Sequence, residues 1–300
     1  MNAFLELVLL LLTIIYSYLE SLVKLFIPLK RKSVKGEIVL ITGAGHGIGK
    51  ITAKKFAKLQ SVLVLWDINK KGVEETAAEC RNIGAVVHTF VVDCSKREDI
   101  STAADKVKQQ VGDVTILINN AGVVNCADLL TLEDQQIQKI FDVNILAHFW
   151  TTRAFLPSMI RKNHGHIVTI ASSAGHIGVA FLVDYCSTKF AAVGYHKALT
   201  AELSVLGKTG IKTTCLCPVF VDTGFVKNPS TRIAPTLKTE DVVNTLVDGI
   251  LTNKKMICIP PFVSLTSFIE VILPERALKA LGKFQDVKFD AKVHCANKEK

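Results

Sequence analysis

The sequence of 300 residues contains eight cysteines but lacks the paired spacing with which cysteines bind metals. Cys215 and Cys217 stand in an apolar run with no second His or Cys pair nearby. We therefore predict no metal site. Most of the thiols are interpreted as small buried hydrophobic groups in a reducing compartment.

The net charge of +9 is not gathered into a stripe interleaved with aromatic residues, which make up only 7% of the chain. A compact basic cluster, Lys30, Arg31, Lys32 and Lys35, directly follows an apolar segment. Attraction to anionic lipid headgroups explains this arrangement more simply than nucleic-acid binding does. We therefore predict no nucleic-acid partner.

The N-terminal segment lacks the positive n-region and the small-residue cleavage site of a signal peptide. Its uncharged part, from Leu7 to Leu19, would form about 20 Å of helix, less than the roughly 30 Å of a hydrocarbon core. Residues 1–35 are therefore predicted to be a membrane anchor with a basic flank, inserted in or lying on the membrane, with the following domain in the cytosol. The alternative is a core helix of that domain.

No internal repeat or low-complexity linker interrupts residues 36–285, and 49% of the chain is hydrophobic, which suffices for a large core. Short apolar runs alternate with helix-like stretches, a pattern typical of βαβ units. We predict a single α/β domain with a Rossmann-type, doubly wound parallel sheet, followed by a loosely held polar tail at 286–300. Its seven expected strands are 37–41, 62–66, 86–91, 115–118, 166–170, 211–216 and 256–259.

A glycine-rich turn stands between the first predicted strand and a helix-like stretch. In this order, backbone N–H groups and the positive end of the helix face a pyrophosphate, which glycine lets the backbone approach. The residues expected to hold a dinucleotide here are Gly43, Gly45, His46, Gly47, Ile48 and Gly49.

Polar or small residues end the next strands. Asp67 can accept hydrogen bonds from the adenosine ribose and would repel a 2′-phosphate, so it favours NAD over NADP. Capping of the next helix is the alternative role of Asp67. Asp93 either meets the adenine edge or caps a helix, and Cys94 follows it. The residues expected to line the crevice after the fourth strand are Asn120, Ala121 and Gly122.

A tyrosine and a lysine carry the expected chemistry. Tyr185 and Lys189 stand four residues apart, on one face of a helix. The ammonium favours the phenolate, so Tyr185 can take a proton from an alcohol. Ser172, at the end of the fifth run, can hold the substrate oxygen, and the adjacent Ser173 is its rival. Chance Tyr-x-x-x-Lys patterns are common, but the combination with the glycine turn is specific.

These motifs resemble those of the short-chain dehydrogenase/reductase family over roughly residues 36–260. The resemblance implies that Asn144 completes a catalytic tetrad by holding a water that joins Lys189 to solvent. It also implies that Pro218 and Thr223 cover the nicotinamide and hold its carboxamide. The sequence departs from the family at Val219, where glycine is usual, and this would tighten or redirect the loop.

The wider sequence is similar to the lipid-droplet 17-beta-hydroxysteroid dehydrogenases. The similarity includes Leu-Trp-Asp-Ile-Asn at 65–69, Asn-Pro-Ser-Thr at 228–231 and Leu-Pro-Glu-Arg at 273–276. It implies an NAD-dependent homodimer on the endoplasmic reticulum and lipid droplets that oxidises hydroxyl groups of steroids, retinoids or bioactive lipids. The family also implies a substrate lid from loops around 222–235 and from the C-terminal part.

The segment 260–274 is rich in apolar residues. We hypothesise that it lies near the membrane surface and lines or feeds an apolar pocket; the alternative is a helix packed on the domain. His176, four residues after Ser172, either contacts substrate or is incidental.

We predict NAD⁺-dependent oxidation of a hydroxyl group on a lipophilic substrate, although reduction is chemically open. A lipid-droplet scaffold with incidental turnover is the alternative from another class of function. A soluble NADP-dependent reductase is disfavoured by Asp67 and by the N-terminal segment.

Overall fold

The computed structural model describes residues 3–24 and 29–294. The chain divides into two compact units, Met1–Ser33 and Val34–Lys300, which we describe separately. Parts of the predicted anchor, residues 1–2 and 25–28, and of the predicted polar tail, residues 295–300, lie outside the described residues.

The first unit contains one described helix, α1 (Ala3–Lys24), of 22 residues. Its apolar side chains are exposed around the helix, and of the helices in the described residues it alone is long and apolar enough to cross a membrane, judged by length and composition. The hydroxyls of Thr13, Ser17 and Ser21 each donate to the carbonyl four residues earlier, at 2.7–2.8 Å. Because these polar groups are satisfied within the helix, they cost little in an apolar medium.

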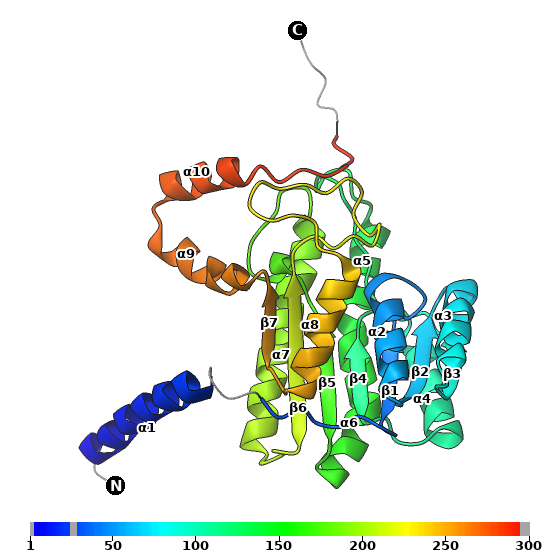
Figure 1. The fold of residues 1–300 in the computed structure, drawn as a ribbon. Coiled ribbons are helices and arrows are strands. Elements are labelled where there is room, and N and C mark those ends of the chain that lie inside the picture. The colour runs from blue at the N-terminus through cyan, green and yellow to red at the C-terminus, as the bar shows by residue number, and fades with distance from the viewer. Residues whose placement is uncertain (1–2, 25–28, 295–300) are drawn as a thin grey trace. The chain divides into compact units, whose positions relative to one another are not determined.

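The second unit is built on a seven-stranded parallel sheet with the order β3-β2-β1-β4-β5-β6-β7 (Figure 1). The predicted Rossmann-type sheet is confirmed, and each predicted strand lies within two residues of the observed one at either end. The strands are β1 (Ile38–Thr42), β2 (Val62–Asp67), β3 (Val87–Val91), β4 (Ile116–Asn119), β5 (Gly165–Ile170), β6 (Ile211–Pro218) and β7 (Met256–Ile259).

Helices cover both faces of this sheet (Figure 1). Alternate side chains of a strand point to opposite faces, so Val39 and Ile41 of β1 join one core cluster and Leu40 joins the other. One face is covered by α2 (Gly47–Lys58), α3 (Lys70–Asn82) and α8 (Thr239–Leu251), and the other by α4 (Arg97–Gln110), α6 (Ala147–Lys162) and α7 (Val183–Val205).

The strand order reverses at β1, which pairs with β2 on one side and with β4 on the other. Since all strands are parallel, their carboxyl ends meet at one edge, and a crevice forms outside this point of reversal. After β7 the chain continues beyond the same edge through η3 (Pro261–Leu265), α9 (Thr266–Ile272) and α10 (Glu275–Gln285) (Figure 1). This edge is where the sequence places its candidate site residues.

Candidate active site

The carboxylate of Asp67, at the end of β2, fixes the glycine-rich turn. The N–H groups of Gly45 and Asn69 donate to its two oxygens, each at 2.8 Å. The side chain that caps α3 is Asn69, which accepts the N–H of Gly72 at 3.2 Å. The capping alternative for Asp67 is therefore wrong, and its carboxylate borders the crevice.

Asn120 holds the same turn from the side of β4. Its Nδ2 donates to the carbonyls of Thr42 and Gly43 at 2.9 and 3.0 Å, and the Thr42 hydroxyl accepts the N–H groups of Asn120 and Ala121 at 3.0 Å. A Cβ on Gly49 would lie only 2.1 Å from the Gly43 carbonyl oxygen, so this position requires glycine. The Asn120 amide thus braces the turn that we expect to hold the ligand.

A cavity of about 310 Å³ opens at these strand ends, a size within the range of ligand pockets. Most of the predicted site residues surround it. Gly45, Gly49, Asp93, Cys94 and Asn144, all described residues, are not among those that line it. Those that line it are Gly43, His46, Gly47, Ile48, Asp67, Asn120, Ala121, Gly122, Ser172, Tyr185, Lys189, Pro218 and Thr223.

Asp93 and Cys94 lie in the turn between β3 and α4. One carboxylate oxygen of Asp93 accepts the N–H and the hydroxyl of Ser95 at 3.0 and 2.7 Å, whereas the N-cap position of α4 is Lys96. The capping alternative for Asp93 is therefore wrong. Cys94 is buried in the core, where burial raises the pKa of its thiol to about 12. Their predicted contact with a cofactor stays a prediction.

Tyr185 and Lys189 lie one turn apart on α7. The Nζ of Lys189 donates to the carbonyl of Ile170, at the end of β5, at 2.9 Å. It also lies 5.5 Å from the centroid of the Tyr185 ring. The lysine side chain is buried, and this burial lowers its pKa to about 8.

The phenol of Tyr185 is shifted in the opposite direction. Burial raises the pKa of Tyr185 above its usual range, and the hydrogen bond with Ser172 opposes that rise. We expected Lys189 to favour the phenolate, but its ammonium lies over the face of the ring. In this structure burial therefore outweighs the expected lowering.

Ser172 and Ser173 both reach the cavity. Ser172 accepts the N–H of Ala174 at 3.1 Å, at the start of the short helix η2 (Ser173–Gly175). Because its hydroxyl also hydrogen-bonds Tyr185, it is better placed than Ser173 to hold a substrate oxygen beside the phenol.

Asn144 lies in a π-helical turn, η1 (Asp142–Leu146), between α5 (Asp134–Phe141) and α6. Such turns are rare and frequent at functional sites. Its side chain accepts the N–H of Val123 at 2.8 Å and donates to the Val123 carbonyl at 2.9 Å and to Thr188 at 3.2 Å. Asn144 thus ties the loop after β4 to the residue before Lys189. The proton relay through a water stays a prediction.

Apolar side chains form another part of the cavity wall. The ring of Phe225 lies 6.1 Å from that of Tyr185. The loop around 222–235 and the segment 260–274 both contribute lining residues, as expected. The loop 177–182 also lines the cavity, which was not predicted, because isolated apolar residues in a loop form no pattern. Further apolar lining residues are Ile177, Val179, Leu182, Phe220, Ile233, Phe262 and Val263.

Pro218 is the last residue of β6, and Thr223 lies on the loop that follows it. The N–H of Val219 donates to the Ile259 carbonyl at 2.9 Å, so the unusual valine extends the pairing of β6 with β7. A Cβ on Gly47 would lie 3.2 Å from the methyl carbon of Thr223, which shows that this loop approaches the glycine turn.

His176, a described residue, is buried and is not among the residues that line the cavity. It lies beside Cys217 and Cys258. The substrate contact that we considered for His176 is therefore not supported by the cavity lining.

The sequence and the fold were compared with those of known proteins. Residues 37–233 match the family model described as short chain dehydrogenase. The chain belongs to the short-chain dehydrogenase family. The 17-beta-hydroxysteroid dehydrogenase 13 of Homo sapiens is 64% identical over 293 residues, which cover 98% of each chain. The estradiol 17-beta-dehydrogenase 11 of Homo sapiens is also 64% identical, over 291 residues and 97% of each chain.

Solved structures support the same family. A short-chain dehydrogenase/reductase from Burkholderia phymatum in complex with NAD is 25% identical, with a TM-score of 0.72, and the match covers 83% of this chain and 96% of that chain. A metagenomic short-chain oxidoreductase in complex with NADP is 25% identical, with a TM-score of 0.65, and covers 76% of this chain and 96% of that chain. The resemblance of the sequence to this family and to the 17-beta-hydroxysteroid dehydrogenases is confirmed.

We expect alcohol oxidation by this dehydrogenase to accelerate as the pH rises. Because burial raises the pKa of Tyr185, the phenol is protonated at neutral pH. The fraction of phenolate, which is the base, therefore increases as the pH rises. The pKa of Lys189 is about 8, so above that value it loses the charge that favours the phenolate. A profile of kcat/KM against pH should rise, and Lys189→Met should lower its acid limb below pH about 8, where Lys189 is charged.

The matched control is Lys197→Met, because Lys197 is an exposed lysine on the same helix. It should leave the profile unchanged. The Nζ of Lys189 lies 5.5 Å from the centroid of the Tyr185 ring, so we expect the limb to depend on both groups. An acid limb that Lys189→Met leaves in place would contradict this account.

Proposed function

We propose that this dehydrogenase oxidises a hydroxyl group of a lipophilic alcohol, a 17-beta-hydroxysteroid or a retinoid or other bioactive lipid alcohol, with NAD as the oxidant. The observation that carries the proposal is that Ser172, Tyr185 and Lys189 share one cavity with the glycine turn and Asp67. Acid–base groups and a dinucleotide cradle in one space are what hydride transfer from an alcohol requires.

The residues at the strand ends fit a dinucleotide. The described helix α2 has no acidic residue in its first turn, and its N-cap residue His46 makes no side-chain capping bond there, so the positive end of α2 can meet a pyrophosphate. The close approach at Gly49 leaves no space for a side chain. The Asp67 carboxylate borders the cavity and favours NAD over NADP, because it would repel a 2′-phosphate.

The chain's own groups then handle the proton of the substrate. Ser172 donates a hydrogen bond to the hydroxyl oxygen, and the Tyr185 phenolate removes the hydroxyl proton. Lys189 supplies positive charge beside the phenolate, and Asn144 supports the path along which the proton leaves. Bound NAD supplies the acceptor for the hydride that leaves the carbinol carbon, so that a carbonyl group forms.

The substrate class follows from the lining and from the relatives. The cavity that Tyr185 lines is also lined by Phe225, Leu182 and Phe262, which favour an apolar molecule. Relatives that are 64% identical are named for 17-beta-hydroxysteroids or estradiol. The alternative function, a scaffold with incidental turnover, is less well supported, because the acid–base groups and the glycine turn for the dinucleotide are both complete.

The proposal is tested by following NADH formation with a panel of steroid, retinoid and hydroxy-fatty-acid alcohols. We expect Tyr185→Phe to lower kcat by about 10²–10⁴-fold, because the general base is removed. Tyr195→Phe is the matched control: Tyr195 lies on the same helix and its hydroxyl donates to Thr152 at 2.6 Å, outside the cavity lining. Undiminished turnover in Tyr185→Phe, or no turnover with any alcohol while NAD binds, would reject the proposal.

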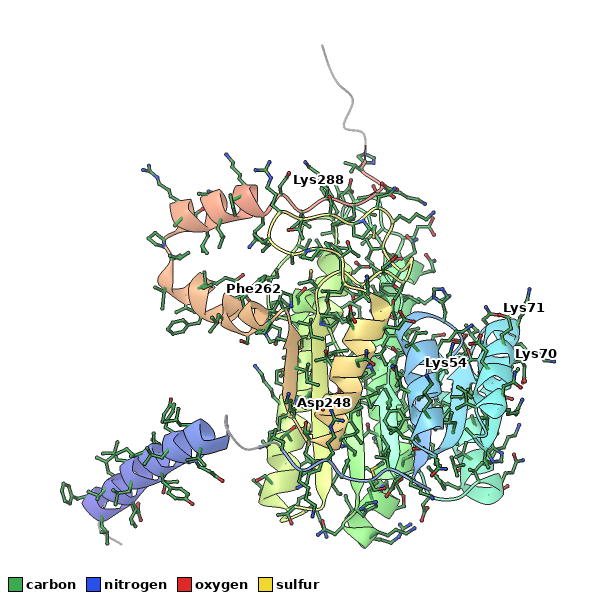
Figure 2. All side chains as sticks on the ribbon, viewed as in Figure 1. Lys54, Lys70, Lys71, Asp248, Phe262 and Lys288 are labelled. Carbon is green, nitrogen blue, oxygen red and sulfur yellow. The ribbon has the colours of Figure 1, made fainter. Side chains whose placement is uncertain are left out.

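We also propose that the enzyme works on a lipid-droplet or endoplasmic-reticulum membrane. Apart from α1, four side chains of η3 and α9 are strongly exposed, and such apolar patches mark interaction surfaces. Phe262 lines the cavity and belongs to the same segment (Figure 2), so a lipophilic substrate has a short route from this surface to Tyr185. The four side chains are Leu265, Phe268, Val271 and Ile272, which are 56%, 66%, 85% and 58% exposed.

This location predicts which peptides a membrane lipid contacts. The full chain bound to vesicles that carry a photoactivatable acyl chain should become labelled on α9 as well as on α1. Val205, which is 87% exposed at the end of α7, is an internal control and should stay unlabelled. Labelling confined to α1, as mapped by mass spectrometry, would contradict contact of α9 with lipid.

A further inference from the structure

Cysteines that are scattered in the sequence meet on β6 and β7. Cys215 pairs with Met256 in the register of the two strands, and Cys217 pairs with Cys258. The Cys217 sulfur lies 3.7 Å from both the Cys215 sulfur and the Met256 sulfur. All four side chains join the core cluster that includes Ala192 and Val193 of α7. A patch of soft ligand atoms therefore lies on this face of the sheet.

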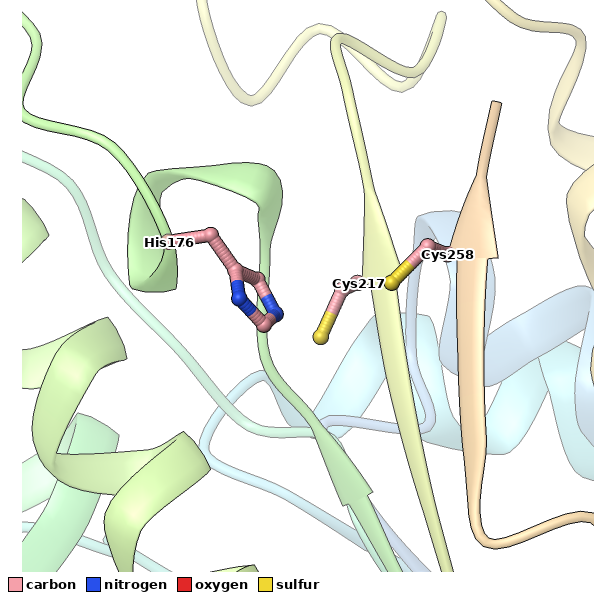
Figure 3. Close-up of side chains that lie close together, drawn as sticks. All are labelled: His176, Cys217 and Cys258. Carbon is pink, nitrogen blue, oxygen red and sulfur yellow. The ribbon is translucent and has the colours of Figure 1, made fainter. Parts of the chain in front are cut away.

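His176 approaches two of these sulfurs from another element. It follows η2, and its ring points toward Cys217 and Cys258 (Figure 3). The ligand atoms of these three residues all lie within 4.8 Å of one another. A Cβ on Gly175, the preceding residue, would lie 2.6 Å from the Lys189 carbonyl oxygen, so η2 packs closely on α7. The backbone therefore fixes the position from which His176 reaches the sulfurs.

We propose that His176, Cys217 and Cys258 bind a zinc ion. Imidazole and thiolate are the ligands that zinc prefers in proteins. With Zn–S near 2.3 Å and Zn–N near 2.0–2.1 Å, a tetrahedral site needs ligand atoms roughly 3.5–3.8 Å apart. Atoms that already lie within 4.8 Å reach this spacing by small side-chain rotations. A water can supply the fourth ligand.

The charge of the site favours a divalent ion. Two thiolates balance the charge of Zn²⁺ and the imidazole is neutral, so the buried site carries no net charge. Binding releases two thiol protons to solvent. Among the described residues, the cluster contains no carboxylate, so hard cations such as Mg²⁺ lack the oxygen ligands that they prefer.

The ion would connect two segments of the active site. His176 lies four residues after Ser172, and Cys217 immediately precedes Pro218. Zinc would therefore tie the loop that carries Ser172 to the end of β6. This inference does not depend on the proposed substrate or on NAD, because it concerns a buried cluster outside the cavity lining.

The test measures zinc in the reduced full chain, purified in detergent, incubated with zinc sulfate and passed through gel filtration. We expect stoichiometric zinc by mass spectrometry in the unaltered protein and a loss of at least ~10-fold in affinity in Cys258→Ser, where one of three ligands is weakened. Cys80→Ser is the matched control, because Cys80 is a buried cysteine of α3 outside the cluster.

Two further readouts separate a built site from chance binding. Co²⁺ should give a thiolate-to-metal charge-transfer band that weakens in Cys258→Ser and in His176→Gln, and Mg²⁺ should not compete with it. Zinc should raise the melting temperature of the unaltered protein and of Cys80→Ser, because it binds the folded state. If Cys258→Ser fails to fold, His176→Gln tests the same zinc site. No retained zinc, or equal retention in both ligand variants, would overturn the proposal.

Discussion

The pairing of β1 with β4 is the constraint on which the active site depends. It brings the glycine turn after β1 next to Asn120 after β4, and the two hydrogen bonds that Asn120 donates to Thr42 lock the two strand ends together. Asp67 holds the turn from the other side, through Gly45. The dinucleotide cradle is therefore built from three consecutive strand ends of the sheet.

The catalytic groups depend on the same edge. The carbonyl of Ile170 at the end of β5 anchors Lys189, and Ser172 follows two residues later. Tyr185 on α7 is then held between Ser172 and Lys189 by a hydrogen bond and by the lysine over its ring. Ser172, Tyr185 and Lys189 therefore line the same cavity as the glycine turn and Asp67.

The sequence predicted the strands well because buried parallel strands are nearly continuous apolar runs. The strand ends differed where polar residues or proline, such as Thr42, Asp67 and Pro218, continue the pairing beyond the apolar run. Tyr185 with Lys189, and the glycine turn, could be singled out because their spacing is local, whereas Asn144 was implied only by the resemblance to the family. The raised pKa of Tyr185 was not predictable, because it depends on burial. The capping role suggested for Asp93 was wrong because the cap of α4 lies at Lys96.

Contacts between segments that are far apart in the sequence could not be predicted, because they leave no local sequence pattern. The apolar residues that line the cavity from loops are isolated side chains, and the cluster of His176, Cys217 and Cys258 joins three segments that are far apart in the sequence. Our prediction of no metal site relied on spacing alone, which detects only ligands that are neighbours in the chain. The register of β6 and β7 places Cys217 beside Cys258, a contact that the spacing of cysteines in the sequence does not reveal.

We propose that the carbinol carbon of the alcohol and the nicotinamide meet beside Tyr185. The most direct test is isotope transfer: the enzyme turns over a lipophilic alcohol that carries deuterium on its carbinol carbon, and the reduced cofactor is analysed by mass spectrometry and NMR. The account predicts NADH that carries one deuterium, placed on a single face of the nicotinamide. NADH without deuterium, or with deuterium on both faces, would contradict it.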